Sequence, residues 1–326
     1  MVSIKDVAKK CGLSVTTVSR VLNNRGYISD EARRKVTEAM KELNYQPNEV
    51  ARSLERMSTN LIGLIVPATD QPFWGSIVQS VEMAASENNY KIMLCNSYNS
   101  PKKEQDYVEM LRCNRVDGMI IASRTSNDKW FQNANMPVVS IDRYIDESVP
   151  MVASDSMQGG ALATEHLIQR GCRKIAHISG DPNLKVVANE RTVAFEKICK
   201  ERGIEFVNKR ITEQQMFKEE TYRDIIEMIL DEHPNIDGFF ASNAIMSLEA
   251  VHVFRERGLS VPRDIRLVGY DDTVLTRLTY PAITTIAQPT YEIGRYAIEL
   301  LIREIKGETV PNRTILPVKL IMRQTT

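Results

Sequence analysis

The sequence predicts an α/β protein in which a small helical head precedes a large body of alternating strands and helices. The first 46 residues hold three short amphipathic segments, each preceded by a serine that can cap a helix. From residue 61 onward, short apolar runs alternate with helical stretches, as parallel sheets with crossover helices require. A length of 326 residues with 43% hydrophobic content allows two or three domains with buried cores.

Three helices are expected in the head, and apolar spacing defines the inner face of each. Ser3, Ser14 and Ser29 are the expected N-caps, Asp6 can complete a capping box with Ser3, and Gly12 begins the first turn. The expected inner positions are Ile4, Val7, Ala8 and Cys11, then Val18, Val21 and Leu22, then Ala32, Val36, Ala39, Met40 and Leu43. This spacing predicts a miniature core shared by all three helices.

The second predicted helix presents a small polar face opposite its apolar one. Two helices joined by a short glycine-containing turn form a helix-turn-helix, whose second helix fits the DNA major groove. On this face Arg20 can bond guanine twice, Thr16 can bond several base edges, and Val15 can contact a thymine methyl. The candidate phosphate contacts are Thr17, Ser19 and Asn23. A polar face that only meets solvent is the alternative interpretation.

Charge is unevenly distributed along the chain. Residues 1–60 contain 11 Lys or Arg and 7 Asp or Glu, whereas the remaining residues contain 31 and 35. The zero formal net charge therefore conceals a mildly basic head, which suits a phosphate backbone.

A short connector helix is expected between the head and the body. Pro47 and Asn48 supply a helix start, and Val50, Ala51 and Leu54 share one face. A helix of about ten residues is shorter than the roughly 12 to 15 needed for stability in water, so its folding should depend on a partner. An ordinary interdomain linker is the alternative. The expected divisions are 1–46 for the head, 47–60 for the connector and 61–326 for the body.

The body is predicted to contain two consecutive α/β units, with a restart after Ser156 and a cleft between two lobes. Expected strands are 61–67, 91–95, 118–122, 138–141, 174–179, 238–242 and 266–270, and expected helices of the second unit are 188–202, 219–232 and 245–257. Ligands of such sheets bind beyond the carboxyl ends of the strands. The candidate binding residues in those loops are Asp70, Phe73, Trp74, Asp142, Arg143, Arg191, Asn243, Asp271 and Asp272.

These residue types suit a sugar, because hydroxyls take directional hydrogen bonds while the apolar face of the ring stacks on an aromatic side chain. Two alternatives remain open at this point. Asp142 and Arg143 can form only a local ion pair at a strand end. Trp74 can fill the interface between the lobes instead of stacking on a ligand.

Other classes of protein find little support in the sequence. The five cysteines are an odd number without a Cys-x-x-Cys pair, which indicates reduced thiols and neither a disulfide framework nor a zinc site. No apolar stretch reaches about 18 residues and no apolar leader is visible, so we expect a cytoplasmic protein without a membrane partner. Dinucleotide, phosphate-loop, zincin and serine-hydrolase motifs are absent and the four histidines are scattered, so neither an enzyme nor a cofactor or metal is predicted.

Several stretches together resemble the LacI/GalR family of bacterial transcription regulators. They are Ile-Lys-Asp-Val-Ala at 4–8, Ser-Val-Thr-Thr-Val-Ser-Arg-Val-Leu-Asn at 14–23, Tyr-Gln-Pro-Asn at 45–48 and Ala-Arg-Ser-Leu at 51–54. The body resembles the effector-binding core of the same family, which is similar to periplasmic sugar-binding proteins. Its matching positions are Phe73, Trp74, Arg191, Asn243 and Asp271.

The resemblance implies a homodimeric repressor that binds palindromic operator DNA and is controlled by a sugar or sugar phosphate. It implies that Leu54, beside Ala51 on the connector, is pushed into the minor groove as an apolar wedge. Gln71, Ala194 and Ala244 depart from the common family pattern, and Ala244 lacks an acceptor that an aspartate would supply.

Two other kinds of protein remain as alternatives to a sugar-responsive repressor. One is a transport-type binding protein, which would lack a DNA-reading head. The other is a regulator that takes a phosphocarrier protein as corepressor, for which a helix at 290–306 with Arg295, Arg303 and Lys306 offers a surface.

Overall fold

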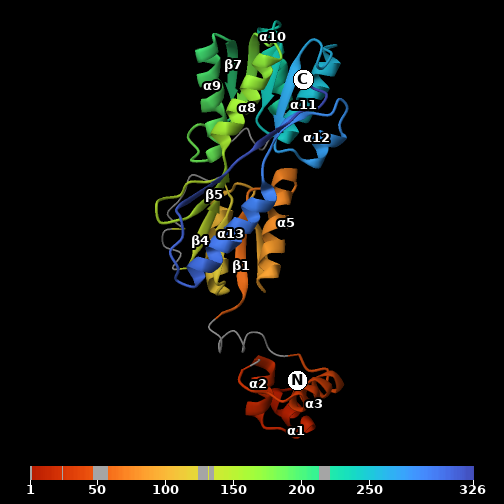
Figure 1. Cartoon of the computed structure of the whole chain (residues 1–326), viewed down its shortest axis with the longest axis vertical. Coiled ribbons are helices and arrows are strands. Elements are labelled where there is room, and N and C mark those ends of the chain that lie inside the picture. The colour runs from red at the N-terminus through yellow and green to blue at the C-terminus, as the bar shows by residue number, and fades with distance from the viewer. Residues whose placement is uncertain (1, 24, 47–57, 124–130, 132–135, 213–220) are drawn as a thin grey trace. The chain divides into compact units, whose positions relative to one another are not determined.

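The computed structural model describes residues 2–23, 25–46, 58–123, 131, 136–212 and 221–326. The chain forms two compact units, Met1–Asn60 and Leu61–Thr326 (Figure 1). The first unit contains the head, and we call the second unit, the predicted body, the core. The predicted connector helix lies outside the described residues. Over the described ranges, every helix is too short or too polar to span a membrane.

The head contains the three predicted helices, α1 (Ile4–Cys11), α2 (Val15–Asn23) and α3 (Asp30–Glu42). Their starts are set by local hydrogen bonds, since Ser14 Oγ accepts from Thr17 N at 3.1 Å and Ser29 Oγ accepts from Ala32 N at 3.3 Å. The buried core residues are Val7, Ala8, Val18, Val21, Val36 and Ala39, all of them predicted inner positions.

The core consists of two lobes, each built on a six-stranded sheet. The first lobe has the strand order β11-β5-β4-β3-β1-β2, with every pair parallel. Its strands are β1 (Leu61–Val66), β2 (Lys91–Asn96), β3 (Gly118–Ile121), β4 (Val138–Ile141), β5 (Met151–Ser154) and β11 (Arg313–Leu316). The central strands are buried throughout, which explains why they are continuous apolar runs in the sequence.

The second lobe has the strand order β12-β10-β9-β8-β6-β7, and only β12 runs antiparallel to its neighbour. Its strands are β6 (Lys174–Ser179), β7 (Glu205–Arg210), β8 (Gly238–Ala241), β9 (Arg266–Tyr270), β10 (Thr284–Ala287) and β12 (Lys319–Ile321). All seven predicted strands are therefore confirmed, and five others were not predicted.

Helices cover the faces of both sheets (Figure 1). Those of the first lobe are α5 (Pro72–Glu87), α6 (Pro101–Cys113) and α13 (Thr290–Ile305). Those of the second lobe are α8 (Ser156–Gln169), α9 (Glu190–Arg202), α10 (Thr221–Glu232), α11 (Ala244–Glu256) and α12 (Val274–Leu278), with a 3₁₀ turn at Val187–Asn189. Figure 1 shows α13 beside α5 over the first sheet, although more than 200 residues separate them in the chain.

The expectation of two consecutive units is wrong, because the chain returns from the second lobe to complete the first. Helix α13 packs against α5, and β11 pairs with β5 in the first sheet. A Cβ atom at Gly294 of α13 would lie 2.6 Å from Ser80 Cβ of α5, so glycine allows the two helices to approach closely. The first lobe thus depends on residues beyond 290 for its core.

All five cysteines are free thiols, as the sequence predicted. Burial raises the pKa of Cys95 and Cys172 to about 11 and that of Cys199 to about 12. Cys11 is half-buried and Cys113, at the end of α6, is exposed. The three core thiols are therefore protonated at neutral pH.

Candidate functional site

The candidate DNA-reading face lies on α2 of the head. Val15, Thr16 and Arg20 are exposed, and these are the three predicted base contacts. The predicted phosphate contacts Thr17, Ser19 and Asn23 are half-buried. Their hydroxyl and amide groups also bond within the helix, since Thr17 Oγ1 lies 2.8 Å from Ser14 Oγ and Asn23 Nδ2 lies 3.4 Å from Ser19 Oγ. Arg20 is therefore the charged residue on the exposed face of α2 that could enter a groove. The other two predicted contacts, Ala51 and Leu54, lie outside the described residues.

A cavity lies in the core where the carboxyl ends of strands from both lobes meet. Its empty space, including the open mouth, is about 820 Å³. The first lobe contributes Gln71, Phe73 and Trp74. The polar lining of the second lobe and the crossover includes Ser179, Asp181, Asn189, Arg191, Thr192, Tyr222, Ser242, Asn243, Asp271 and Gln288. Five of the nine candidate binding residues, Phe73, Trp74, Arg191, Asn243 and Asp271, are thus brought together here.

The aromatic wall of the cavity is made by the first turn of α5. Phe73 and Trp74 are only 8% and 3% exposed, and their rings meet edge to face with centroids 4.9 Å apart. Both side chains also belong to the apolar core of the first lobe. Packing on that core holds the wall in place, so an apolar sugar face would meet a rigid surface.

Arg191, in the first turn of α9, places a buried cation in the cavity wall. Its guanidinium lies 3.6 Å from the centroid of the Tyr270 ring, and Nη1 donates to Ser242 O at 2.7 Å. Its Nε is buried and has no hydrogen-bond partner among the described residues. The side chain is fixed by stacking and by one carbonyl, which leaves donor capacity for a ligand hydroxyl.

The close approach of α8 to α9 explains why Arg191 reaches this position. A Cβ atom at Gly160 of α8 would lie 2.3 Å from the Arg191 carbonyl oxygen. Only glycine fits at that point, and any side chain there would displace the start of α9. The position of the cation therefore depends on a small residue in a different helix.

Asp271 follows β9 with a left-handed backbone, φ +83°, which turns its side chain between two elements. Oδ1 accepts from Gln288 Nε2 at 2.7 Å and Oδ2 accepts from Ala244 N at 3.2 Å. Gln288 Oε1 in turn accepts from Ser154 Oγ at 2.5 Å, at the end of β5. A hydrogen-bond chain thus links the carboxylate of the second lobe to the first lobe.

Asn243 serves both the fold and the cavity. Its Oδ1 caps α11 by accepting from Met246 N at 2.8 Å, and its Nδ2 donates to the Tyr222 hydroxyl at 3.1 Å. Ala244 uses its backbone N–H to bond Asp271. Asn243 therefore presents its amide from the start of a fixed helix.

Four candidate binding residues do not line the cavity, namely Asp70, Asp142, Arg143 and Asp272. Asp70 is exposed, because α5 begins after it and turns Gln71 and the two aromatic residues inward. Arg143 is only 2% exposed, and its Nη1 lies 3.2 Å from Glu104 Oε1 of α6. Its charge therefore forms an ion pair inside the first lobe and does not face the cavity.

Sequence reasoning missed seven polar lining residues of the second lobe and the crossover, namely Ser179, Asp181, Asn189, Thr192, Tyr222, Ser242 and Gln288. Ser179 ends a strand that was predicted, so its place in that strand was the signal that could have found it. Gln288 follows β10, which was not predicted, and therefore gave no such signal. Tyr222 lies at the start of α10, away from any strand end.

His177 of β6 is fully buried and bonds to Thr192, which lines the cavity. Its Nδ1 is 2.9 Å from Phe240 O and its Nε2 is 3.0 Å from Thr192 Oγ1. A carbonyl can only accept, so the neutral ring carries its proton on Nδ1 and accepts from Thr192 at Nε2. Burial lowers the pKa of His177 to about 4.

Acidification should therefore destabilise the core through His177. The unfolded chain takes up a proton near pH 6.5 and the folded chain only near pH 4, so this stability is complete above about pH 6.5 and is lost as the pH falls. Between pH 8 and pH 5 the loss should be about 2 kcal/mol. Urea denaturation at pH 8 and pH 5 measures the change in the free energy of unfolding between the two pH values. This change should be about 2 kcal/mol smaller in His177→Gln than in the control His252→Gln, which replaces an exposed histidine. Equal pH dependence in the two variants would rule out this role.

Comparison with known proteins covers both units. Residues 3–48 match the model of the bacterial regulatory proteins of the lacI family, and residues 164–326 match the periplasmic binding protein-like domain. The ribose operon repressor of Halalkalibacterium halodurans is 38% identical over 327 residues, which cover 100% of this chain and 97% of the relative.

Solved structures agree with the sequence comparison. The lac repressor dimer bound to operator and the anti-inducer ONPF has a TM-score of 0.88 at 28% identity, covering 99% of this chain and 98% of its own. A periplasmic binding protein/LacI transcriptional regulator from Alkaliphilus metalliredigens, complexed with D-xylulofuranose, has a TM-score of 0.73 at 32% identity, covering 82% of this chain and 99% of its own. With such similarity along its whole length, this chain belongs to the LacI family of bacterial regulatory proteins.

Proposed function

We propose that this protein is a transcriptional repressor whose head reads an operator and whose cavity binds a small sugar that controls operator affinity. The observation that carries the proposal is the presence, in one chain, of an exposed α2 face and a polar, partly aromatic cavity between two lobes. The repressor names of its relatives and the operator-bound state of the lac repressor structure support the same function. Transcription regulation of this kind takes place in the cytoplasm.

The effector in this proposal is a five-carbon sugar or its phosphate. Arg191 and Asn243 offer donors, Asp271 offers an acceptor, and Trp74 with Phe73 offers an apolar face. The ribose operon repressor and the D-xylulofuranose complex both point to a pentose. A phosphocarrier protein as corepressor has less support, because Arg295 and Arg303 of α13 already face Glu299 and Glu308.

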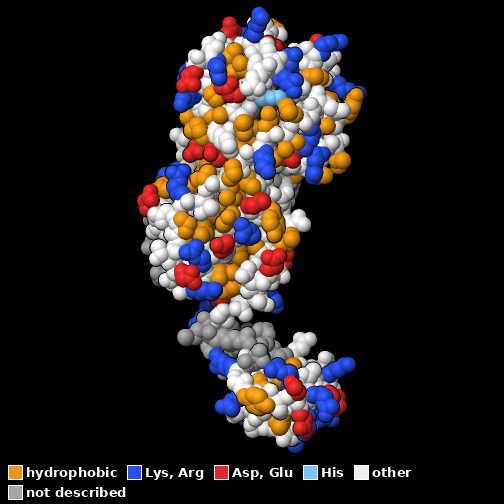
Figure 2. All heavy atoms as spheres, viewed as in Figure 1, with side chains coloured by type: hydrophobic (Ala, Val, Ile, Leu, Met, Phe, Trp, Pro, Cys, Tyr) orange, Lys and Arg blue, Asp and Glu red, His pale blue; other side chains and the backbone are white. Residues whose placement is uncertain are grey.

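A homodimer is part of the proposal, since two heads are needed for a palindromic operator. Large apolar side chains are exposed on both lobes, including Leu94 on the edge strand β2 and Leu278 and Tyr280 after β9. Figure 2 shows hydrophobic side chains gathered in patches between charges on the visible face of the core. Exposed apolar surface of this kind is typical of subunit interfaces.

Effector control follows from the two lobes. A sugar that bonds to both sides of the cavity favours one relative rotation of the lobes, and in a dimer this changes the separation of the two connectors at 47–60. Leu54 then enters or leaves the minor groove between the half-sites. The expected coupling between sugar and operator is about 1 to 3 kcal/mol.

Operator binding in the presence of sugars tests the proposal. A duplex selected from a random pool would be titrated with the protein by fluorescence anisotropy, alone and with D-ribose, D-xylulose, their phosphates or sucrose. We expect one pentose or pentose phosphate to change the operator Kd about five- to 150-fold. No selected duplex, or no effect of any sugar, would contradict the proposal.

Arg20→Ala should weaken specific operator binding by about 1 to 3 kcal/mol, because a bidentate contact to guanine is lost. Binding to random duplex should fall much less, since that binding depends on total charge. Arg34→Ala removes the same charge from the exposed surface of α3 and is the matched control. Equal losses on specific and random DNA would show that Arg20 does not read bases.

A further inference from the structure

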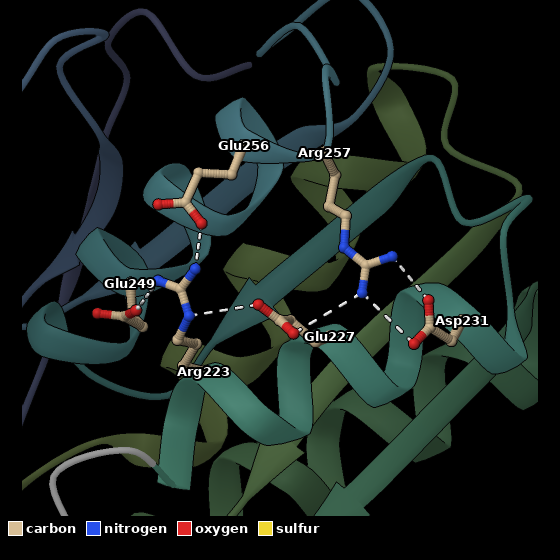
Figure 3. Close-up of polar contacts among 6 residues, drawn as sticks. All are labelled: Arg223, Glu227, Asp231, Glu249, Glu256 and Arg257. Carbon is tan, nitrogen blue, oxygen red and sulfur yellow. Dashed lines mark hydrogen bonds and ion pairs between the residues drawn. The ribbon is translucent and has the colours of Figure 1, made fainter.

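An alternating network of charges joins α10 to α11 on the outside of the second lobe (Figure 3). Arg223 of α10 contacts Glu249 at 3.4 Å and also Glu256, both on α11. Arg257, just after α11, contacts Asp231 of α10 at 2.7 Å. Glu227 lies between the two arginines, 3.3 Å from Arg223 and 3.8 Å from Arg257. Two arginines and four carboxylates thus form one continuous network, which we call the α10–α11 clamp.

One end of this clamp is adjacent in the chain to a residue that lines the cavity. Arg223 directly follows Tyr222, whose side chain lines the cavity and whose hydroxyl accepts from Asn243 Nδ2. Asn243 is the N-cap of α11, the helix that carries Glu249 and Glu256. The same two helices are therefore joined twice, by the clamp on the surface and by the Tyr222–Asn243 hydrogen bond at the cavity.

Buried apolar side chains also join α10 to α11. Ile225, Ile226 and Ile229 of α10 belong to the same buried cluster as Ala250 and Phe254 of α11. Burial of these side chains holds the two helices together without a directional bond. Charge-assisted hydrogen bonds of an arginine fork are directional, and each carboxylate of the clamp accepts them only over a narrow range of positions.

Single exposed ion pairs stabilise proteins little, whereas shared carboxylates in a network act together. Glu227 is shared by both arginines, and Arg223 contacts three carboxylates at once. A lysine has a compact ammonium on a flexible stem and does not reproduce this fork. The geometry therefore favours a role in register over a role in overall stability.

We infer that Arg223 is a positioning residue for the effector cavity: through the α10–α11 clamp it holds Tyr222 in register with Asn243. The inference deepens the proposed function and rests on it where the sugar is concerned. Loss of Arg223 lets α10 shift along α11, so the Tyr222 hydroxyl loses Asn243 and the Asn243 amide loses its orientation towards the cavity. Loss of Arg257, at the far end of the clamp, should disturb the Tyr222–Asn243 hydrogen bond less than loss of Arg223 does.

A double-mutant cycle on D-ribose affinity tests the positioning role. By calorimetry on the full-length protein, Arg223→Ala should raise the Kd about three- to tenfold in the wild-type background, the effect of one hydrogen bond. In a Tyr222→Phe background the same change should raise it less than about twofold, because the hydroxyl that Arg223 positions is already gone. Arg223→Lys should lie between Arg223→Ala and the wild type. Equal losses of affinity in both backgrounds would overturn the inference.

Hydrogen exchange of the free protein tests it without any sugar. Arg223→Ala should accelerate exchange in peptides covering α10 and the first turn of α11 and leave the rest of the core unchanged. Arg202→Ala is the matched control, because it removes an exposed ion pair with Glu165 that joins α8 to α9 instead. Unchanged exchange in Arg223→Ala, or the same change in Arg202→Ala, would overturn the inference. If the wild type binds no ribose while exchange responds as expected, the proposed effector is wrong and the positioning role stands.

Discussion

Replacing Glu104 by alanine should lower the free energy of unfolding of the core by about 3 to 5 kcal/mol, the cost of leaving a buried charge without its partner. Glu104 and Arg143 are 0% and 2% exposed, and their side chains lie 3.2 Å apart. Arg143 Nη1 also donates to Ser123 O at 3.1 Å, and the guanidinium lies 5.1 Å from the centroid of the Phe131 ring. These contacts hold the cation in place but do not neutralise it.

Urea denaturation followed by circular dichroism measures this loss. Asp106→Ala is the matched control, because it removes an exposed carboxylate from the same helix and should change the free energy of unfolding by less than about 0.5 kcal/mol. Glu104→Gln keeps an acceptor for Arg143, so its free energy of unfolding should lie between those of Glu104→Ala and Asp106→Ala. A Glu104→Ala variant as stable as Asp106→Ala would show that the pair has no net role in stability.

Arg191→Ala should weaken binding of the effector sugar by about 3 kcal/mol, on the order of a hundredfold in Kd, because hydrogen bonds from a buried cation to the ligand are lost. Stacking on Tyr270 and the bond to Ser242 already orient the guanidinium. The ligand therefore need not spend binding energy on ordering this side chain. Operator affinity without sugar should stay unchanged, since Arg191 lies in the core.

Calorimetry with the sugar measures sugar affinity, and operator titrations with and without the sugar measure operator affinity and its response. The variant should bind operator like the wild type and no longer respond at sugar concentrations that saturate the wild type. Arg202→Ala, at the other end of α9, removes an arginine from the same helix without touching the cavity and should respond normally. Full sugar response in Arg191→Ala would exclude this residue from recognition.

The three helices of the head could be predicted because their signals are local. Each helix start depends on a serine within three residues of its bonding partner, and each core residue repeats at helical spacing. The central strands of both lobes could be predicted for a similar reason, since strands buried on both faces are continuous apolar runs. Strands β11 and β12 have three to four residues and are partly exposed, so nothing distinguishes them from loops in the sequence.

The candidate site was predictable where a residue follows a recognisable strand and not where its role depends on a distant partner. Arg143 and Arg191 were both candidate cavity residues in the sequence, and a local ion pair was the alternative for Arg143. Glu104, 39 residues away from Arg143, commits that arginine to the interior of the first lobe, whereas Gly160 and Tyr270 place Arg191 at the cavity. Such contacts arise only when the whole sheet is assembled.

The contrast between the exposed Cys113 and the protonated core thiols makes the unaltered chain suitable for selective labelling. Maleimide reagents attack thiolates, and burial keeps Cys95, Cys172 and Cys199 protonated and out of reach. A fluorophore should therefore attach preferentially at Cys113, on a helix of the first lobe and outside the cavity lining. Energy transfer to a dye on an operator duplex would then report movement of that lobe in the native sequence.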